Sequence, residues 1–455
     1  MLTTMALTLC GAAVAPSSTA EASDKAKTYV VVLKDSVTDP AATAAKNVGS
    51  YGGARTAVFT HAFKGYAATM TAAQATALKT DPTVRFVADG GTFRRGPLSP
   101  EKPARCKGSS GDVGQCLPDW ADRIDAERSS TRSGDGRGSV DVNVAVLDDG
   151  IAADQPDLNV KGGVDCLTGS PLTPGNSLSD PGGHGTAVAG VVGAKDNDIG
   201  VVGVAPGTPL QSVKVLDDNG DGSTASVLCG LDWVASTRTD NDPANDIAVA
   251  NMSLSGPGTD DRSCGTVNQD VLHFAVCNLV RAGVTLVANA GNEHYDFSGS
   301  IPASYDEVLT VTAMADFDGQ PGGKAAPDCY GFDFGLLGDA DDEAVLGLSN
   351  FAKSRADSRH TVSAPGSCVE TTYLPPSRFA IVSGTSFSAP AVAGVTALCI
   401  AKGRCGASTP ARNLRTIVSD AKKYNRADPR YGFFGDPRRP IPGRYYGDLV
   451  SADRY

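Results

Sequence analysis

Serines cluster in SGTSFSAPAVAG, residues 383–394, which leads into a stretch rich in Ala and Val. The candidate nucleophiles are Ser383, Ser386 and Ser388. A serine hydroxyl attacks a carbonyl carbon at neutral pH only when an imidazole takes its proton and a carboxylate fixes the tautomer of that imidazole. A catalytic serine therefore requires a histidine and an acid from elsewhere in the chain. Without them, a polar cap on a buried helix is the simpler interpretation.

Histidines are few, at positions 61, 184, 273, 294 and 360. His184 lies in PGGHGTAVAGVVGA, where glycines lead into a helix of small residues that can pack closely on a sheet. His273 and His294 occupy ordinary helix and loop contexts, and His360 leads into a late segment that could form a strand. Read alone, each is more often a surface or core histidine than a base.

The candidate acid is Asp148, which ends the apolar run VAVLD and is followed by Asp149 and Gly150. Active sites gather at the carboxyl ends of parallel strands. Read alone, Asp148 is slightly better explained as a cap of a turn or helix.

The elements that must position these residues alternate between apolar runs and helical stretches. After residue 139, apolar runs recur at 210–215, 246–251, 283–290 and 307–313. Helical stretches fall at 184–194, 226–237, 267–282 and 386–401. This alternation predicts an α/β fold with a mostly parallel sheet covered by helices on both faces.

A smaller unit precedes this domain. Strands are predicted at 28–33, 66–70 and 83–88, with helices at 40–50 and 71–80. Residues 90–114 follow, rich in Gly, Pro, Ser and charge and without periodicity. Such a stretch is typical of a linker or processing segment.

Composition and the first residues bear on partners and compartment. The chain has 40 Lys+Arg against 51 Asp+Glu, a net charge of −11, which argues against nucleic acid or an anionic membrane as partner. Residues 1–22 predict a signal peptide that ends at Ala20-Glu21-Ala22. No basic residue precedes its apolar core, which a true start upstream or a misassigned start codon would explain. Leu9 before Cys10 disfavours lipidation, and no other apolar run could span a bilayer.

Removing the signal leaves ten of the 11 cysteines, an even number that suggests disulfides in an exported protein. The sequence does not fix their connectivity. Pairs close in sequence are Cys106 with Cys116, Cys264 with Cys277, and Cys399 with Cys405.

Three segments, VAVLDDGI, GGHGTAVAG and SGTSFSAPAVAG, occur in the order Asp, His, Ser, and each closely resembles a signature of the subtilisin-like serine peptidases, the subtilases. The resemblance runs from about Gln115 to the end. It implies a subtilisin-like fold and a secreted, self-processing, monomeric endopeptidase of broad specificity with an acyl-enzyme mechanism. It implies roles for Asp148 in orienting the imidazole, His184 as base and acid, and Ser386 as nucleophile. Asn292 and the Ser386 N–H would bind the oxyanion.

The same resemblance assigns substrate binding to Ser253, Leu254, Ser255 and Gly291. The first three match an extended segment that pairs with substrate backbone and walls the first specificity pocket. Ser255 replaces a common glycine, and Asn289 stands where a small residue is usual. Asp149 also departs from the Thr or Ser that usually follows the catalytic Asp. A DDG triplet is familiar from the kexin and furin branch of the family, which cuts after paired basic residues. The segment HGTAVAG does not resemble that branch, which disfavours this specificity.

A structural calcium site is implied as well, and no organic cofactor. Its ligands would be carbonyls and side chains of six residues, namely Gln115, Asp157, Lys195, Asn197, Ile199 and Val201. Oxygen ligands from a flexible loop suit Ca²⁺. Residues 217–223, DDNGDGS, lack the terminal Glu of an EF-hand loop and are predicted to form an ordinary turn.

Residues 28–90 resemble the subtilase propeptide, a ferredoxin-like βαββαβ domain that inhibits its own peptidase. The predicted division is signal peptide 1–22, propeptide 23–93, processing segment 94–114 and catalytic domain 115–455. Cleavage is expected between about Ala88 and Gly114, with Phe93-Arg94-Arg95 as one exposed candidate. An acidic insertion between Ala315 and Ser349 is predicted to be a surface loop, with Cys329 paired to Cys368.

Three alternatives compete with this interpretation. A binding protein that keeps the fold without activity is disfavoured by the complete triad and Asn292. The acid-acting sedolisins share the fold but use Glu where His184 stands, so the GHG motif disfavours this class. An α/β-hydrolase is disfavoured because Ser386 lies in GTSFS instead of GxSxG, and the order of the triad residues is wrong.

Overall fold

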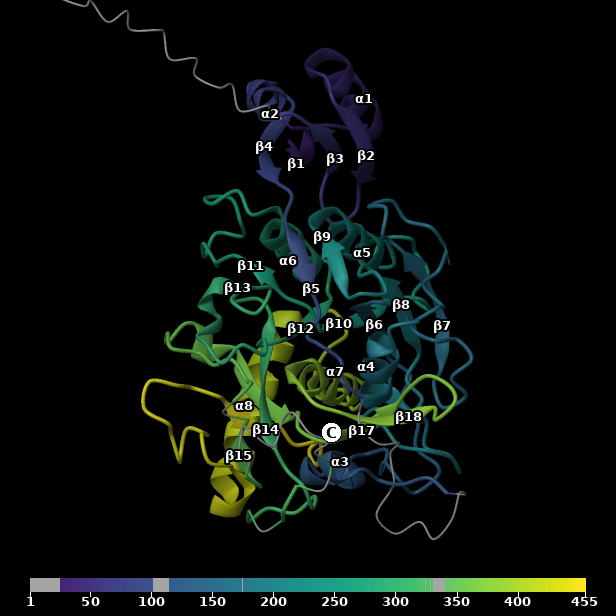
Figure 1. Cartoon of the computed structure of the whole chain (residues 1–455), viewed down its shortest axis with the longest axis vertical. Helices are drawn as coiled ribbons and strands as arrows, with labels where there is room; N and C mark the ends of the chain where they lie inside the picture. Colours follow the sequence, from purple (N-terminus) through teal and green to yellow (C-terminus); the bar gives the residue numbers. More distant parts are fainter. Residues whose placement is uncertain are drawn as a thin grey trace, which may run out of the picture.

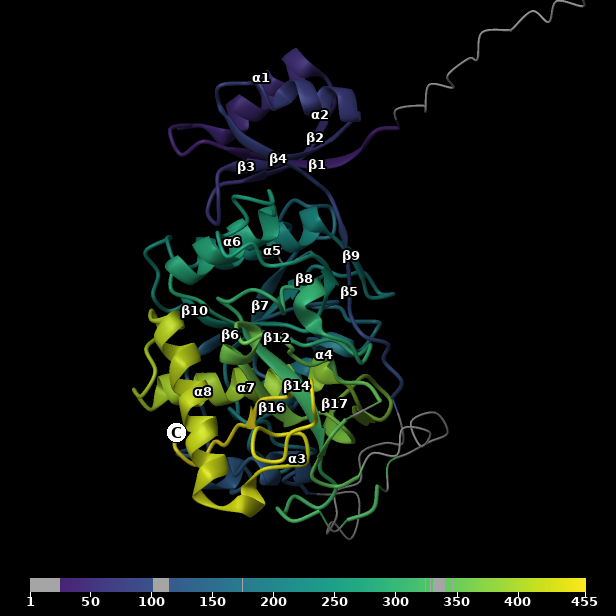
Figure 2. The same ribbon diagram turned by 90° about the vertical axis from the view of Figure 1, so that its left-hand side faces the viewer.

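The computed structural model describes residues 25–100, 114–173, 175–323, 325–327, 329, 340–345 and 347–455. The predicted signal peptide, Cys106 and residues 330–339 of the acidic insertion lie outside these ranges. A small domain, here called the leader, is at the top of Figure 1 and above the large domain in Figure 2.

The leader has the order β1 (Lys27–Leu33), α1 (Pro40–Tyr51), β2 (Ala54–Phe59), β3 (Gly65–Met70), α2 (Ala72–Leu78) and β4 (Val84–Asp89). Its sheet order is β2-β3-β1-β4, with antiparallel pairing. Asp39 caps α1, and Thr71 and Gln74 form a capping box at the start of α2. Every element except β2 corresponds to a segment recognised from sequence pattern.

The large domain is built on one sheet with the order β19-β16-β14-β12-β10-β6-β8-β7, and each pair along this path is parallel. The bounds are β6 Asn143–Asp148, β7 Val160–Asp165, β8 Leu210–Lys214, β10 Ile247–Met252, β12 Thr285–Asn289, β14 Leu309–Ala315, β16 Thr361–Pro365 and β19 Asp448–Leu449. In β6, Val144 and Val146 pack in one core, while Ala145 and Leu147 pack in the other. Burial on both faces explains the continuous apolar runs.

Helices cover both faces, which confirms the predicted fold class. One core contains residues of α4 (His184–Gly193), α7 (Thr385–Ala401) and α8 (Pro410–Ala427). The other contains residues of α5 (Thr224–Ser236) and α6 (Val271–Arg281). The predicted helix at 267–282 was too long at its start, because the Asp270 carboxylate accepts the N–H groups of Leu272 and His273 and caps α6 there.

The shorter elements lie in the connections. They are β5 (Thr92–Arg94), α3 (Asp119–Arg123), β9 (Asp221–Ser223), β11 (Gly256–Pro257), β13 (Ser300–Ile301), β15 (Glu343–Ala344), β17 (Val369–Thr372) and β18 (Phe379–Val382). The prediction of an ordinary turn at 217–223 was wrong for its last three residues, because β9 pairs with β5.

The leader rests on α5 and α6 (Figure 2). The Asp232 carboxylate of α5 accepts the backbone N–H groups of Thr60, His61 and Ala62, at 3.1, 2.7 and 2.7 Å. Phe63 and Phe86 of the leader meet the Phe274 ring of α6 edge-on, and leader residues share one apolar core with both helices. Docking therefore combines apolar burial with a carboxylate that recognises main chain.

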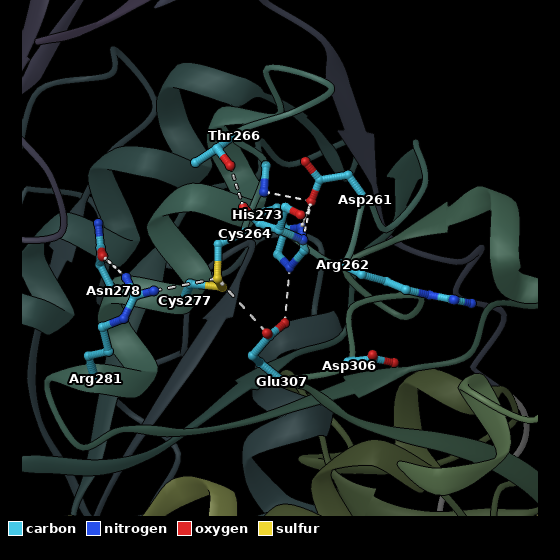
Figure 3. Close-up of a disulfide and its surroundings, with 12 residues drawn as sticks. Asp261, Arg262, Cys264, Thr266, His273, Cys277, Asn278, Arg281, Asp306 and Glu307 are labelled. Atoms are coloured by element: carbon cyan, nitrogen blue, oxygen red, sulfur yellow. Dashed lines mark hydrogen bonds and ion pairs between the residues drawn. A yellow bond between two sulfur atoms is a disulfide. The ribbon is translucent and has the colours of Figure 1, made fainter. Parts of the chain in front are cut away.

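Disulfides join loops and helices of the large domain. They pair Cys166 with Cys229, Cys264 with Cys277, Cys329 with Cys368, and Cys399 with Cys405. Three of these pairs match the predictions, and the Cys264–Cys277 pair, which joins the loop before α6 to that helix, is seen in Figure 3. Cys116 is also disulfide-bonded, while its predicted partner Cys106 lies outside the described residues. Among the residues that can be described, no helix has both the length and the apolarity to cross a membrane.

Candidate active site

Asp148 and His184 meet where a strand ends and a helix begins. Asp148 is the last residue of β6, and His184 is the first of α4, after Gly183 with φ of 78°. A hydrogen bond of 2.8 Å joins His184 Nδ1 to Asp148 Oδ1, and both residues are fully buried. His184 Nε2 has no hydrogen-bond partner within the described ranges. The imidazole is therefore held on one side and left available on the other.

Ser386 stands in the first turn of α7, which follows Gly384 with φ of 141°. Its carbonyl accepts a hydrogen bond of 2.8 Å from Ser253 Oγ. Its own hydroxyl is buried without a hydrogen-bond partner among the described residues. The start of a long helix favours negative charge, so this hydroxyl lies where a developing oxyanion is stabilised.

Asn292 is oriented by the residue before the serine. Its Oδ1 accepts both the N–H and the hydroxyl of Thr385, at 2.9 and 2.7 Å, which turns Nδ2 toward the cleft. The N–H of Gly291 donates to the same hydroxyl at 3.2 Å, and Gly291 has φ of 103°. A Cβ added to Gly96 would lie 2.5 Å from Asn292 Nδ2 and 3.6 Å from Ser386 Oγ. The Asn292 amide and the Ser386 hydroxyl therefore both face the position of Gly96.

Buried acids dominate the electrostatics. Burial opposes protonation of His184, but the charge of Asp148 and its hydrogen bond outweigh burial and raise the pKa of His184. Burial, helped by the neighbouring charge of Asp148, raises the pKa of Asp149 to about 6. Burial also raises the pKa of Asp180 to about 7, although its carboxylate accepts hydrogen bonds from Gly183 and Thr186. This environment favours an imidazolium at His184.

The segment that follows the leader, which contains β5, runs beside these residues. β5 pairs antiparallel with β9, and Arg94 exchanges backbone hydrogen bonds of 2.9 and 2.8 Å with Ser255. Figure 1 shows β5 descending from the leader toward the centre of the molecule. Of the predicted substrate-binding residues, Ser255 therefore contacts extended backbone, while Ser253 and Leu254 are buried behind it. The predicted exposure of Phe93 was wrong: insertion of β5 leaves that residue 3% exposed.

The predicted calcium ligands converge around Asp157. Gln115 Nε2 donates to the carbonyl oxygens of Lys195 and Val201, at 2.6 and 3.4 Å. Asn197 Nδ2 donates to Asp157 Oδ1 at 2.8 Å. Burial raises the pKa of Asp157 to about 7.

The sixth predicted ligand residue, Ile199, donates its N–H to Asn197 Oδ1 at 2.8 Å. The amide nitrogens of Gln115 and Asn197 donate to oxygens of the proposed site, while the Gln115 Oε1 accepts the N–H of Asn197 at 2.9 Å. Both amides would therefore have to turn over for their oxygens to face an ion there. A buried carboxylate, two amides and several carbonyls form an oxygen donor set of the kind that Ca²⁺ takes.

Sequence reasoning assigned no function to three acids whose carboxylates bind other groups in the fold. Asp180 hydrogen-bonds the start of α4, Asp232 binds the leader backbone, and Asp149 pairs with Arg95. The acid beside Asp148 was noticed as a departure from the family pattern, which was a usable signal. The other two stand in ordinary helix and turn contexts without a comparable signal.

Comparisons with known proteins cover both domains. A model described as "Subtilase family" matches residues 139–433, and one described as "Peptidase inhibitor I9" matches residues 28–89. The "Thermostable alkaline protease" of Halalkalibacterium halodurans is 35% identical over 286 residues, 63% of this chain and 63% of the relative. "Subtilisin Savinase" of Lederbergia lenta is 34% identical over 301 residues, 66% of this chain and 90% of that protein. "Subtilisin E" of Bacillus subtilis is 29% identical over 403 residues, 87% of each. The chain spans less than two thirds of the length of the first of these relatives.

Proposed function

The chain belongs to the subtilase family, and on that premise we propose that it is a serine endopeptidase that hydrolyses polypeptides. The observation that carries the proposal is the buried hydrogen bond between Asp148 and His184, together with Ser386 Oγ and Asn292 Nδ2 facing Gly96 at the end of a segment held as extended backbone. The ring of Phe387, the residue after Ser386, lies 5.3 Å from the His184 ring, centroid to centroid. Pairing through main chain suits broad specificity at most substrate positions.

In the proposed mechanism, Ser386 Oγ attacks the scissile carbonyl carbon while His184 Nε2 takes the hydroxyl proton. Asp148 holds the imidazole through Nδ1 and stabilises the imidazolium. The carbonyl oxygen becomes negative and is bound by Asn292 Nδ2 and the N–H of Ser386. His184 then gives its proton to the leaving amine, and water releases the acyl group from Ser386 by the same steps in reverse.

We further propose that the protein is exported as a precursor in which the leader is the intramolecular inhibitor. Residues 23–93 are its propeptide, 94–114 the processing segment and 115–455 the catalytic domain. Support comes from β5, which occupies the cleft as a product-like strand, and from the disulfides, which persist in oxidising compartments. The first cut is made by the protein itself within the processing segment.

A structural Ca²⁺ is part of the proposal. Asp157, Asn197 and Gln115 would hold it with side-chain oxygens, and Lys195, Ile199 and Val201 with carbonyls. The ion would lock the loop after α4 and contribute nothing to the chemistry. Chelation is expected to lower the melting temperature of the wild type but not that of Asp157→Asn, and equal shifts in both proteins would refute this ligand set.

The decisive experiment is mass spectrometry of secreted wild type beside Ser386→Ala, together with assays on denatured protein. The wild type is expected to begin within residues 94–115 and to hydrolyse the substrate. Ser386→Ala is expected to accumulate as uncleaved precursor without activity. Ser388→Ala is the matched control, because it removes a buried hydroxyl from the same helix. Normal maturation and cleavage by Ser386→Ala would overturn the proposed mechanism.

A further inference from the structure

A second buried histidine, His273 of α6, lies beside a loop that carries two adjacent acids. Its Nε2 is 2.9 Å from Glu307 Oε2. Its other ring nitrogen, Nδ1, is buried and has no hydrogen-bond partner among the described residues. This nitrogen faces Asp260 Oδ1 at 3.5 Å and Asp261 Oδ1 at 3.4 Å, and the His273 side chain is 0% exposed. Figure 3 shows Asp261 and Glu307 on opposite sides of the ring.

The carboxylates around this ring have little positive charge to balance them. The side chains of Asp260 and Asp261 are 9% and 5% exposed. Asp270 and Glu307 add two further acids whose charges act on His273. Within the ranges that the structure describes, no Lys or Arg forms an ion pair with any of these four acids. Buried charges are stable only when they are paired, and one imidazolium would leave an excess of negative charge that a divalent ion reduces.

The spacing of the three facing atoms is that of ligands around a small tetrahedral ion. Ligand atoms about 2.0–2.2 Å from a tetrahedral Zn²⁺ lie about 3.3–3.6 Å from one another. Both distances from His273 Nδ1 fall in this range, and the three ligand atoms all lie within 4.8 Å of one another. Tyr305 stacks on the face of the ring, with the centroids 4.1 Å apart, and so leaves the ring edge that carries Nδ1 uncovered.

Backbone groups hold the two carboxylates in place. Asp260 Oδ1 accepts the N–H of Arg262 at 2.6 Å, and its Oδ2 accepts that of Asp306 at 3.2 Å. The Asp261 carboxylate accepts four backbone N–H groups, those of Ser263, Gly265, Val267 and Asn268. Such bonds favour the ionised form of a carboxylate. Both acids therefore present negative oxygens to His273 Nδ1 from a loop whose shape is fixed.

Glu307 supports the histidine from the other side. In neutral His273 one ring nitrogen carries the proton, and the partner of that nitrogen decides which one it is. Because Nε2 donates to the Glu307 carboxylate, Nδ1 keeps a free lone pair. A carboxylate behind a histidine ligand in this way fixes its tautomer and increases its basicity toward a metal ion.

We propose that Asp260, Asp261 and His273 form a structural zinc site, with His273 Nδ1 and one oxygen of each carboxylate as ligands and water as the fourth. The nitrogen ligand and the short spacing favour Zn²⁺ over Ca²⁺, which takes six to eight oxygen ligands at about 2.3–2.6 Å. The ion joins the loop before α6 to that helix and is separate from the calcium site proposed at Asp157. In protein stripped of metal, a proton on Nδ1 takes the place of the ion.

The test measures Zn²⁺ binding by isothermal titration calorimetry, using the full chain with Ser386→Ala, which prevents self-digestion, after chelation and dialysis. Asp260→Asn and His273→Gln are each expected to abolish binding at this site. Glu307→Gln leaves the three ligands in place and is expected to weaken binding about 10- to 100-fold. Asp306→Asn is the matched control, because it removes a neighbouring carboxylate outside the ligand set, and the original affinity is expected to survive.

A second control separates this site from another group of possible ligands, Asp148, Asp149 and His184. His184→Gln, in the same background, is expected to bind Zn²⁺ as tightly as its parent. Loss of binding in His184→Gln but not in His273→Gln would place the ion at the candidate active site and overturn the inference. Absence of binding by the parent protein would overturn it as well.

A third measurement needs no variant of the site. Crystals of the Ser386→Ala protein grown with Zn²⁺ are measured on both sides of the zinc absorption edge. An anomalous peak is expected about 2.0–2.1 Å from His273 Nδ1. Peaks only at other residues would contradict the inference even if His273→Gln failed to fold.

Discussion

Two buried histidines of this molecule have similar neighbours and different uses. His184 and His273 are both fully buried, and each has one ring nitrogen bonded to a carboxylate, Asp148 at 2.8 Å or Glu307 at 2.9 Å. His184 Nε2 has no hydrogen-bond partner in the described ranges. His273 Nδ1 also makes no hydrogen bond among the described residues, but it lies within ion-pair distance, 3.5 and 3.4 Å, of the carboxylates of Asp260 and Asp261.

Carboxylates, among them those of Asp261 and Glu307, lie around the His273 ring (Figure 3). Its ring stacks on Tyr305 with the centroids 4.1 Å apart, and the Cys264–Cys277 disulfide closes the loop beside it. The Asp261 carboxylate accepts several backbone N–H groups, which lower its pKa to about 2 even though burial opposes this. A histidine among acids therefore becomes a candidate base only when one nitrogen stays open beside a nucleophile.

The largest expected effect separates the two histidine–carboxylate pairs. Asp148→Asn keeps the shape of the side chain but favours the wrong tautomer of His184, and kcat is expected to fall about 10⁴-fold. Glu307→Gln, the matched change beside His273, is expected to leave kcat unchanged. Steady-state kinetics of variants matured with wild-type leader would measure both. Equal losses of kcat in the two variants would contradict a catalytic role for His184 and a structural role for His273.

The disulfide beside His273 is expected to matter for stability alone. Replacing Cys264 and Cys277 by serine opens a loop with a sequence separation of 13 and is expected to cost up to about 3 kcal/mol of unfolding free energy. Urea denaturation in the Ser386→Ala background avoids self-digestion. A change in kcat per folded molecule when both cysteines are replaced in the active enzyme would contradict a purely structural role for this disulfide.

Glu307→Gln also has a smaller effect of its own. Removing the charge weakens the hydrogen bond to His273, and the unfolding free energy is expected to fall by about 1–2 kcal/mol. The same denaturation assay measures it, with Asp306→Asn as control because Asp306 is a half-exposed neighbour in the loop. A loss as large in the control would mean that the loop, and not the pair, sets the effect.

Lowering the pH is expected to protonate both histidines, which reduces catalysis at His184 and increases the contribution of His273 to stability. Despite burial, nearby carboxylates raise the pKa of both His184 and His273. The proposed mechanism needs neutral His184, so kcat/KM is expected to fall as pH drops through that raised pKa. The His273 contribution to stability is complete below its ordinary pKa and is lost as pH rises through the raised one. Urea denaturation of wild type and His273→Gln, both carrying Ser386→Ala, measures this as a stability difference that shrinks with rising pH.

Much of the fold could be predicted because central strands are continuous apolar runs. β7 was missed because it has the sequence VKGGVD, in which two glycines and a lysine break the apolar pattern. α8 was missed because polar and charged residues together outnumber its apolar ones, although Leu414, Ile417 and Ala421 mark a buried stripe. Edge strands and surface helices carry weaker patterns because only one of their faces is buried.

The residues of the proposed triad could be named from motifs, whereas their surroundings could not. Arg95 and Asp149 are far apart in sequence, and only the docking of β5 brings them together. Asp232 lies within an otherwise apolar helix, and nothing local indicates that its partners are backbone N–H groups of another domain. Interactions between distant segments depend on tertiary placement, which local patterns do not record.

The strand β5 also has a consequence for the kinetics of maturation. Because it belongs to the same polypeptide as Ser386, its local concentration at the cleft does not change when the solution is diluted. The half-time of the proposed first cut is therefore independent of precursor concentration. Once cut, the leader becomes an ordinary dissociable ligand, and dilution alone then shifts the population toward the free enzyme.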